Sequence, residues 1–425
     1  MTSDLGGSQM TRKKSIGRMA FLCTVGLALV AATPSGLGLI LVDFVPRNMG
    51  HPGLDGAISV ALSPDGTSVY VAGKDANGLI TFSRDTEGNL IDLGSTINNG
   101  SSIHGLLGAH SVVVSPNGKH VYVASAVDDA VAFLSRNTST GVLTFREAEY
   151  DGDGLIDGLN TAICVTVSPD GNHIYVVGFN DNAIAIFSRD HITGFMAFED
   201  VVKNTDPGVE GLAQVYSVVV SPDNKHVYTA ANTDDAVAVF SRSSSTGALS
   251  LVEVEKDGVG GVDGLWGATD VAVSPDGQYV YAVGSRDSSL VVFARDAATG
   301  ELTFLTSYKD GVNGIDGLGG AISVAVSPHG RHVFVACYAD DALVAFARAP
   351  GSGMLEFSDL RRDNVNPGGG VLDSAQAVTV SPDSIHVYVA ATEADVLTEW
   401  KVTDLGFFEA EPPNDLLPSV QGGRR

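Results

Sequence analysis

The sequence is poor in cysteine, tryptophan and basic residues. Its 425 residues include 3 cysteines, 2 tryptophans and only 25 Lys and Arg against 50 Asp and Glu, so the formal net charge is −25. A chain this acidic repels phosphate backbones, and we therefore expect no nucleic acid among its partners. We interpret the acidic surface as a solubility device, with attraction of metal cations or basic partners as the functional alternative.

Several motifs that identify enzyme and metal-site classes are also missing. The sequence contains no P-loop, nucleophile elbow, HExxH motif or CxxC pair. Cys23 falls in an N-terminal apolar stretch, while Cys164 and Cys337 lie three repeats apart at different points of the repeat described below. We therefore expect two buried free thiols and no disulfide between them.

The N-terminal apolar stretch is short for a membrane span. Four basic residues between positions 12 and 18 precede residues 19–32, and a run of small residues ends at Ala32. This order is typical of a secretory signal. We expect a signal peptide at 1–32 and a secreted, periplasmic or cell-envelope protein. The alternative is an uncleaved anchor continuing through Leu41, the only case in which a membrane is a partner.

One repeat occurs seven times in the chain. Each copy has an apolar run, SPDG or a near variant, a VYVA-like run, an acidic turn, an AVAVFSR-like run, a TG-type turn and an LTF-like run. Short valine-rich runs bounded by Pro, Asp and Gly are typical of strands joined by tight turns, and no helical periodicity is present. The copies of SPDG begin at Ser63, Ser115, Ser168, Ser221, Ser274, Ser327 and Ser381.

This repeat predicts an all-β protein, a seven-bladed β-propeller with four antiparallel strands per blade. A four-stranded sheet cannot cover both of its faces alone, so the blades must pack in a closed ring. We expect a monomeric propeller at 33–411 and a flexible tail at 412–425. Residues 35–44 resemble an outermost strand and are expected to complete the last blade. The alternative closing strand is LGFFEAE, from Leu405.

The VYVA and AVAVFSRD runs after each SPDG resemble the Tyr-Val-Thr-Asn type of propeller repeat and the lactonase-like seven-bladed propellers of bacteria. The resemblance covers nearly all of the chain after the predicted signal. It implies a sugar-lactone hydrolase, a muconate cycloisomerase-like protein or a surface protein. The shared motifs belong to the scaffold, so the resemblance assigns no catalytic residue.

The candidate site residues come from copies that depart from their own consensus near the predicted channel mouth. His104 and His110, next to Asp270 or Asp157, are the candidates for acid–base or metal chemistry. Imidazole, carboxylate, amide and aromatic groups together are typical of a small-molecule pocket, although drift after duplication produces the same pattern. The ligand-binding candidates are Asn160, Tyr216, Trp266, Asp373 and Gln376.

The run DGDGLIDG is the candidate metal site. It places Asp151, Asp153 and Asp157 at a spacing similar to that of a calcium loop, and calcium prefers hard oxygen ligands. The run is shorter than an EF-hand loop and lacks its terminal Glu. Bound Ca²⁺ is one expectation, and Asp-Gly turns that only shape the loop are the other. No other cofactor is expected.

Two functions remain open from the sequence. The first is an exported ligand- or protein-binding, surface-interaction module that takes a small molecule, glycan or protein at the channel-mouth face. Near-uniform blades without a catalytic constellation favour it. The alternative is a lactonase-like or muconate cycloisomerase-like enzyme with its pocket at the channel mouth.

Overall fold

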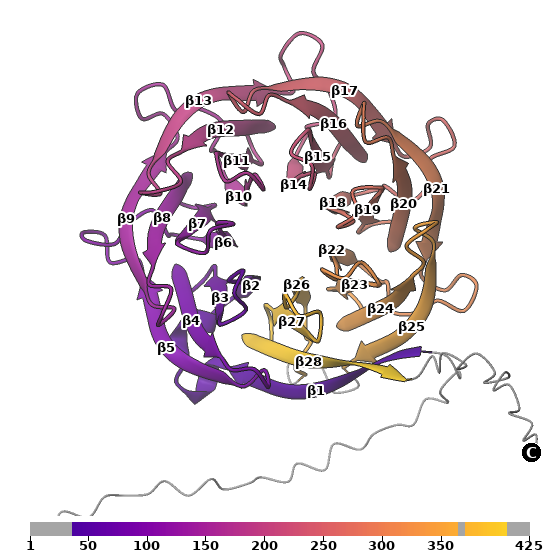
Figure 1. Ribbon diagram of the computed structural model, residues 1–425, viewed down its shortest axis with the longest axis horizontal. Helices are drawn as coiled ribbons and strands as arrows, with labels where there is room; N and C mark the ends of the chain where they lie inside the picture. Colours follow the sequence, from indigo (N-terminus) through magenta and orange to yellow (C-terminus); the bar gives the residue numbers. More distant parts are fainter. Residues whose placement is uncertain (1–35, 364–369, 406–425) are drawn as a thin grey trace, which may run out of the picture. The chain divides into compact units, whose positions relative to one another are not determined.

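A computed structural model describes residues 36–363 and 370–405, and its strands form seven four-stranded antiparallel sheets. The sheets stand as blades around a ring (Figure 1), which confirms the predicted seven-bladed propeller. The predicted signal peptide, the predicted tail and the alternative closing run after Leu405 lie outside the described residues. Within those residues, no helix has the length and apolar character needed to cross a bilayer.

Each blade contains four strands, which in blades 1 to 6 run in chain order from the centre of the ring outward (Figure 1). The innermost strands are β2 (Ala57–Leu62), β6 (Ala109–Val114), β10 (Ala162–Val167), β14 (Val215–Val220), β18 (Ala268–Val273), β22 (Ala321–Val326) and β26 (Ala375–Val380). The second strands are β3 (Ser68–Gly73), β7 (His120–Ser125), β11 (His173–Gly178), β15 (His226–Ala231), β19 (Tyr279–Gly284), β23 (His332–Cys337) and β27 (His386–Ala391).

Blades are numbered 1 to 7 from the one that begins with β2. Their third strands are β4 (Gly78–Arg84), β8 (Ala130–Arg136), β12 (Ala183–Arg189), β16 (Ala236–Arg242), β20 (Ser289–Arg295), β24 (Ala342–Arg348) and β28 (Val396–Leu405). The outermost strands are β5 (Leu90–Ile97), β9 (Leu143–Tyr150), β13 (Met196–Lys203), β17 (Leu249–Lys256), β21 (Leu302–Lys309), β25 (Leu355–Arg362) and, in blade 7, β1 (Gly36–Pro46). The 3-10 helices η1 (Arg47–Met49) and η2 (Pro52–Leu54) lie between β1 and β2.

The N-terminal strand closes the ring. β1 pairs antiparallel with β28, from Gly36 opposite Leu405 to Pro46 opposite Val396. Leu39 of β1 is buried against blades 6 and 7. The predicted closure by residues 35–44 is thus the one that forms, and blade 7 is built from both ends of the described chain.

The hydrophobic core consists of seven layers, one between each pair of adjacent blades. The second strands are buried along almost their whole length because each is covered by a blade on either side. Between blades 2 and 3, for example, Tyr122 and Val131 pack in one cluster with Val165 and Ile174. Stability is therefore shared among interfaces between neighbours, as in other repeat proteins.

Seven side-chain hydrogen bonds join the blades at the end of the ring that carries the interblade linkers, called the mouth face below. In blade 2, Asp129 lies in the turn between β7 and β8 with φ of 51°, and its carboxylate accepts the Thr161 N–H of the next linker. Asn and Asp tolerate this left-handed backbone and supply the acceptor. The seven acceptors are Asn77, Asp129, Asn182, Asp235, Ser288, Asp341 and Asp395.

A second network joins the blades at the opposite end, the turn face, which carries the SPDG turns. Arg242 of blade 4 donates from Nε to the buried Tyr175 hydroxyl of blade 3 (2.7 Å) and from Nη1 to Asp170 (3.0 Å). The recurring arginine is therefore structural, as its position in six blades suggests. Each member bonds a tyrosine of the preceding blade: Arg84, Arg136, Arg189, Arg242, Arg295 and Arg348.

The junction between blades 6 and 7 replaces this network with apolar groups. Phe334 stands at the tyrosine position, and Val402 at the arginine position of β28 packs against it. His329 takes the place of the SPDG aspartate and bonds to the Ser384 hydroxyl (2.6 Å). The arginine, tyrosine and aspartate have changed together, so these three positions hold no arginine–carboxylate pair.

Candidate active site

Every innermost strand begins with a β-bulge at the mouth face. In β6, the register shifts between Ala109 and Ser111, so His110 has no partner in the ladder. A bulge changes the direction of the side chain that it carries. The residues at this position are Ile58, His110, Ile163, Tyr216, Thr269, Ile322 and Gln376.

His110 of blade 2 and Tyr216 of blade 4 meet although blade 3 stands between them. Their ring centroids are 6.2 Å apart in an edge-to-face arrangement, and Phe179 of blade 3 lies 6.1 Å from Tyr216. Contact between blades that are not adjacent requires both side chains to project into the central channel. With Cys164 and Asp270, which lie one position further along their strands, these residues form the channel-mouth cluster.

Hydrogen bonding and burial fix the state of His110. Its Nδ1 lies 2.9 Å from the Ile163 carbonyl oxygen, so Nδ1–H is the donor and Nε2 remains an acceptor. Burial, helped by the positive charge of Lys74, lowers the pKa of His110 to about 4. The imidazole is therefore neutral near pH 7.

Asp270 connects three blades in a polar ring below His110. One carboxylate oxygen accepts the Ser217 hydroxyl of blade 4 (2.7 Å), and the other accepts the Val324 N–H of blade 6 (2.9 Å). Burial raises the pKa of Asp270, while these hydrogen bonds act in the opposite direction. Four other blades have serine at this position, and three of them, Ser59, Ser111 and Ser323, accept the equivalent N–H.

Tyr216 and Cys164 remain protonated in this cluster. Burial raises the pKa of the Tyr216 hydroxyl, and it raises the pKa of the Cys164 thiol to about 11. A protonated thiol is a poor nucleophile, whereas a protonated phenol is a hydrogen-bond donor. The cluster thus offers a neutral nitrogen acceptor and a hydroxyl donor at one end of the channel.

Most of the other sequence-predicted ligand residues lie on the rim of the mouth face. Asn160, Trp266 and Asp373 occupy the same linker position, where each backbone carbonyl accepts an N–H from the following hairpin turn. Trp266 exposes half of its surface (50%). Gln376 lies on the bulge of β26 and bonds to the Ser374 hydroxyl (3.4 Å). The mouth face therefore carries the predicted ligand residues together with His110 and Asp270.

The structure does not bring His104 to His110. Nδ1 of His104 lies 2.8 Å from the Tyr150 hydroxyl, and its ring packs edge-on against Phe145, both on the outermost strand β9. Four other blades have an ion pair in place of the His104–Tyr150 contact. These pairs are Asp157–Lys203, Glu210–Lys256, Asp263–Lys309 and Asp316–Arg362.

The carboxylates nearest one another in DGDGLIDG differ from the predicted set. Asp151 and Asp157 gather with Asp181 from the next hairpin turn, and Asp153 is not a member of this group. The Lys203 amino group contacts Asp157 (2.7 Å), and its pKa is raised by that bond and by the other two carboxylates. The lysine ammonium group offsets one of the three negative charges of this group, and bound Ca²⁺ at these residues stays a prediction.

Two members of the channel-mouth cluster were missed in the sequence. Phe179 follows the second strand of its blade, where the other copies have Lys74, Ala126, Asn232, Ser285, Tyr338 and Thr392. The variability of this repeat position could have marked Phe179 as a candidate site residue. Cys164 stands where four other blades have serine, at the position after the bulge. This departure from the consensus was a weaker sign of a site residue, because a buried cysteine is common in any core.

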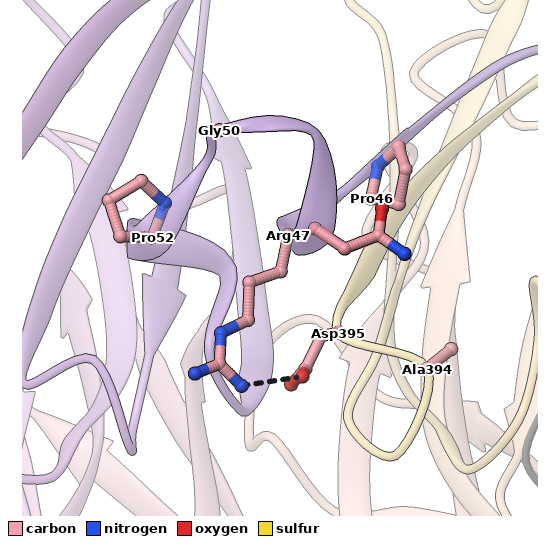
Figure 2. A pocket seen from close by; sticks show the side chains of 7 residues that line it. Pro46, Arg47, Gly50, Pro52, Ala394 and Asp395 are labelled. Atoms are coloured by element: carbon pink, nitrogen blue, oxygen red, sulfur yellow. Dashed lines mark hydrogen bonds and ion pairs between the residues drawn. The ribbon is translucent and has the colours of Figure 1, made fainter.

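A shallow pocket of about 390 Å³ lies beside the ring closure (Figure 2). Arg47 reaches from η1 to Asp395 (3.1 Å) in the turn before β28, and it also pairs with Asp55 (2.8 Å). The arginine thereby joins blade 7 to the start of blade 1. Since its charge is used in that junction, this pocket is a weaker candidate than the channel mouth.

Comparison with known proteins supports an enzyme. The family described as "Lactonase, 7-bladed beta-propeller" matches residues 42–156, 164–316 and 261–368. A 6-phosphogluconolactonase of Klebsiella pneumoniae (strain 342) is 23% identical over 285 residues, which cover 67% of this chain and 80% of the relative.

Solved structures agree in fold. A periplasmic gluconolactonase of Pseudomonas aeruginosa is similar at 22% identity and a TM-score of 0.57, covering 72% of this chain and 87% of that one. A putative 6-phosphogluconolactonase of Bacteroides uniformis gives 21% identity, the same TM-score, and coverage of 71% and 87%. The first function expected from the sequence, a binding or surface-interaction module, is therefore wrong, and these relatives favour the lactonase-like alternative.

Proposed function

Because the chain belongs to the lactonase, 7-bladed β-propeller family, we propose that it hydrolyses a sugar lactone at the channel-mouth cluster. The observation that carries this proposal is the approach of His110 and Tyr216 across the channel, with the imidazole neutral and the phenol protonated. Hydrolysis of a cyclic ester needs these two functions, a base for water and a donor for the carbonyl oxygen.

In the proposed reaction, Nε2 of His110 takes a proton from water as the water oxygen bonds to the lactone carbonyl carbon. The Tyr216 hydroxyl donates a hydrogen bond to the carbonyl oxygen as negative charge develops there. The bond between the carbonyl carbon and the ring oxygen then breaks, and the ring oxygen receives the proton held on His110. The product is the open hydroxy acid, and His110 returns to its neutral form.

We propose an uncharged sugar lactone as the substrate. The chain carries twice as many acidic as basic residues, which disfavours a phosphorylated substrate. The half-exposed Trp266 offers an aromatic surface on the rim for a sugar ring. We also propose export from the cytoplasm, because basic residues precede an apolar stretch at 19–32 and one similar structure is a periplasmic gluconolactonase.

The test is hydrolysis of glucono-δ-lactone, measured as acid release above the uncatalysed rate. We expect His110→Gln to lower kcat/KM by about 100-fold or more, the usual contribution of a general base. The wild-type rate should fall on the acid side only near pH 4, because burial lowers the pKa of His110 to about 4. His104→Gln is the matched control and should retain the rate. Equal loss in both variants, or no loss at His110, would refute the assignment.

A further inference from the structure

Five of the six arginines at the turn face meet a carboxylate from the preceding blade. The side chain of Arg242, for example, is fully buried and makes one bond from each terminal nitrogen to Asp170 (3.0 and 3.2 Å). The five pairs are Arg84–Asp383, Arg136–Asp65, Arg242–Asp170, Arg295–Asp223 and Arg348–Asp276. A buried guanidinium normally requires such a partner.

Arg189 of blade 3 lacks this carboxylate because blade 2 has Asn117 at the aspartate position. Only the amide oxygen of Asn117 faces the guanidinium, at 3.3 Å from Nη2, while its NH₂ group donates to the His191 carbonyl (2.7 Å). Among the described residues, Nη1 of Arg189 bonds the Gly171 carbonyl alone. Nη1 of Arg295 likewise bonds one carbonyl, so the difference lies at Nη2, which meets a neutral amide oxygen in Arg189 and a carboxylate in Arg295.

The other side chains that Arg189 bonds match those of Arg295. Both arginines bond a buried tyrosine, Tyr122 or Tyr228, and a histidine, His120 or His226. Burial and the arginine charge lower the pKa of each histidine, so neither adds a charge. Glu147 and Asp190 near Arg189 correspond to Glu253 and Asp296 near Arg295. Among the groups that the two arginines contact directly, the junctions therefore differ by one carboxylate. The exposed Glu301 also stands where the Arg189 junction has Phe195.

A pocket of about 380 Å³ lies directly beside this incomplete partner set. Arg189, Asn117 and His191 line it, together with Pro116, Asp170, Gly171 and Asn172. Asp170 does not neutralise Arg189, because both of its carboxylate oxygens bond to Arg242 of the next blade. The pocket thus connects a buried cationic group to solvent.

We propose that this turn-face pocket binds a small oxyanion, a phosphate or a carboxylate, on Arg189. The junction between blades 6 and 7 supports this assignment by contrast, since there the arginine, tyrosine and aspartate positions are all altered and hold no arginine–carboxylate pair. Between blades 2 and 3 only the carboxylate has been replaced. A bound oxyanion supplies the missing acceptor in the geometry that guanidinium groups prefer. The site lies on the face opposite the channel mouth and is independent of the proposed lactonase activity.

The experiment measures Tm of the whole protein against inorganic phosphate and, separately, acetate, each with sodium chloride at matched ionic strength as the control for screening. In the wild type we expect a saturable rise of about 1–3 °C beyond the chloride control. Asn117→Asp should raise Tm in phosphate-free buffer and remove the anion-dependent rise, because it restores the carboxylate present in five other junctions. The relative size of the two responses distinguishes phosphate from carboxylate ligands.

Asp223→Asn is the matched gain-of-site variant, since it reproduces the Asn117 arrangement at Arg295. It should lower Tm without anion and show a larger anion-dependent rise than the wild type. The proposal is overturned if Asn117→Asp responds to phosphate and acetate as the wild type does, or if the wild type shows no response beyond chloride.

Discussion

Glu399 is the most unusual buried residue outside the mouth face. It lies on β28 opposite Tyr388, where blades 2 to 5 have Phe133, Ile186, Val239 and Val292. Its side chain is fully buried beside Tyr388 and His386, and Nε2 of His386 lies 3.7 Å from one carboxylate oxygen. Burial raises the pKa of Glu399 to about 7, against the opposing charge of Arg84.

This shift predicts a pH-dependent stability. The folded pKa exceeds the usual 4.5, so the unfolded chain loses this proton first as the pH rises. Glu399 therefore stabilises the fold most below pH 4.5, and this contribution is lost between pH 4.5 and 7. We expect the free energy of unfolding of Glu399→Gln, relative to the wild type, to increase by roughly 3 kcal/mol across that range, measured by denaturant titration.

Glu356→Gln, on the exposed side of β25, is the control for a general charge effect. A constant difference between Glu399→Gln and the wild type across this pH range would show that the carboxyl titrates near its ordinary pKa in the folded protein.

The sequence predicted the location of some candidate site residues correctly and of others wrongly. His110, Tyr216 and Asp270 lie together because they depart from the consensus at bulged or adjacent positions of the innermost strands. His104 also departs from the consensus, yet it packs against β9 because it stands where other blades have an acid paired with a strand-end base. The two histidines are told apart only when the contact between the linker and the outermost strand of each blade is known. That contact is tertiary and cannot be read from the local sequence.

At the scale of the element, the arginine, tyrosine and aspartate at the turn face act as a unit. Removing one member leaves its buried partners without hydrogen bonds, which costs more than replacing the members together. We expect Arg242→Val to destabilise the fold by about 3 kcal/mol, and Arg242→Val with Tyr175→Phe to recover part of that loss. Chemical denaturation of both variants and of Tyr175→Phe measures the coupling.

The blade 6–7 junction is the natural precedent for this double replacement, since it combines Val402 with Phe334. Additive losses in the two single variants would show that Arg242 and Tyr175 are not coupled.

The strands themselves were predictable because each is short, rich in valine and alanine, and bounded by a turn with a strong sequence signal. SPDG is an example: Ser63 bonds the Asp65 carboxylate, and Gly66 adopts a φ of 69°. The Asp151, Asp153 and Asp157 run was less informative, because its role depends on Lys203, which is distant in sequence. A local sequence pattern identifies a turn, but it does not identify the distant side chain that forms an ion pair with that turn.

At the scale of the whole molecule, stability depends on the contact of β1 with blade 7. Leu39 is 1% exposed, whereas its neighbour Ile40 is 56% exposed. We expect Leu39→Ala to lower the free energy of unfolding by about 2–5 kcal/mol, and Ile40→Ala to change it little. Because opening this junction uncovers blades 1, 6 and 7 together, unfolding should stay a single transition in circular dichroism at lower denaturant. A separate early transition would contradict this cooperative closure.

The pairing of β1 with β28 also sets the order of assembly. Gly36 leaves the ribosome early, while its partner Leu405 follows more than three hundred residues later. The strand that is synthesised first must remain unpaired until the strand that is synthesised last arrives, and its apolar side chains stay open to other sheet edges during that time. Protection of this one segment by a chaperone would thus decide the yield of folded protein.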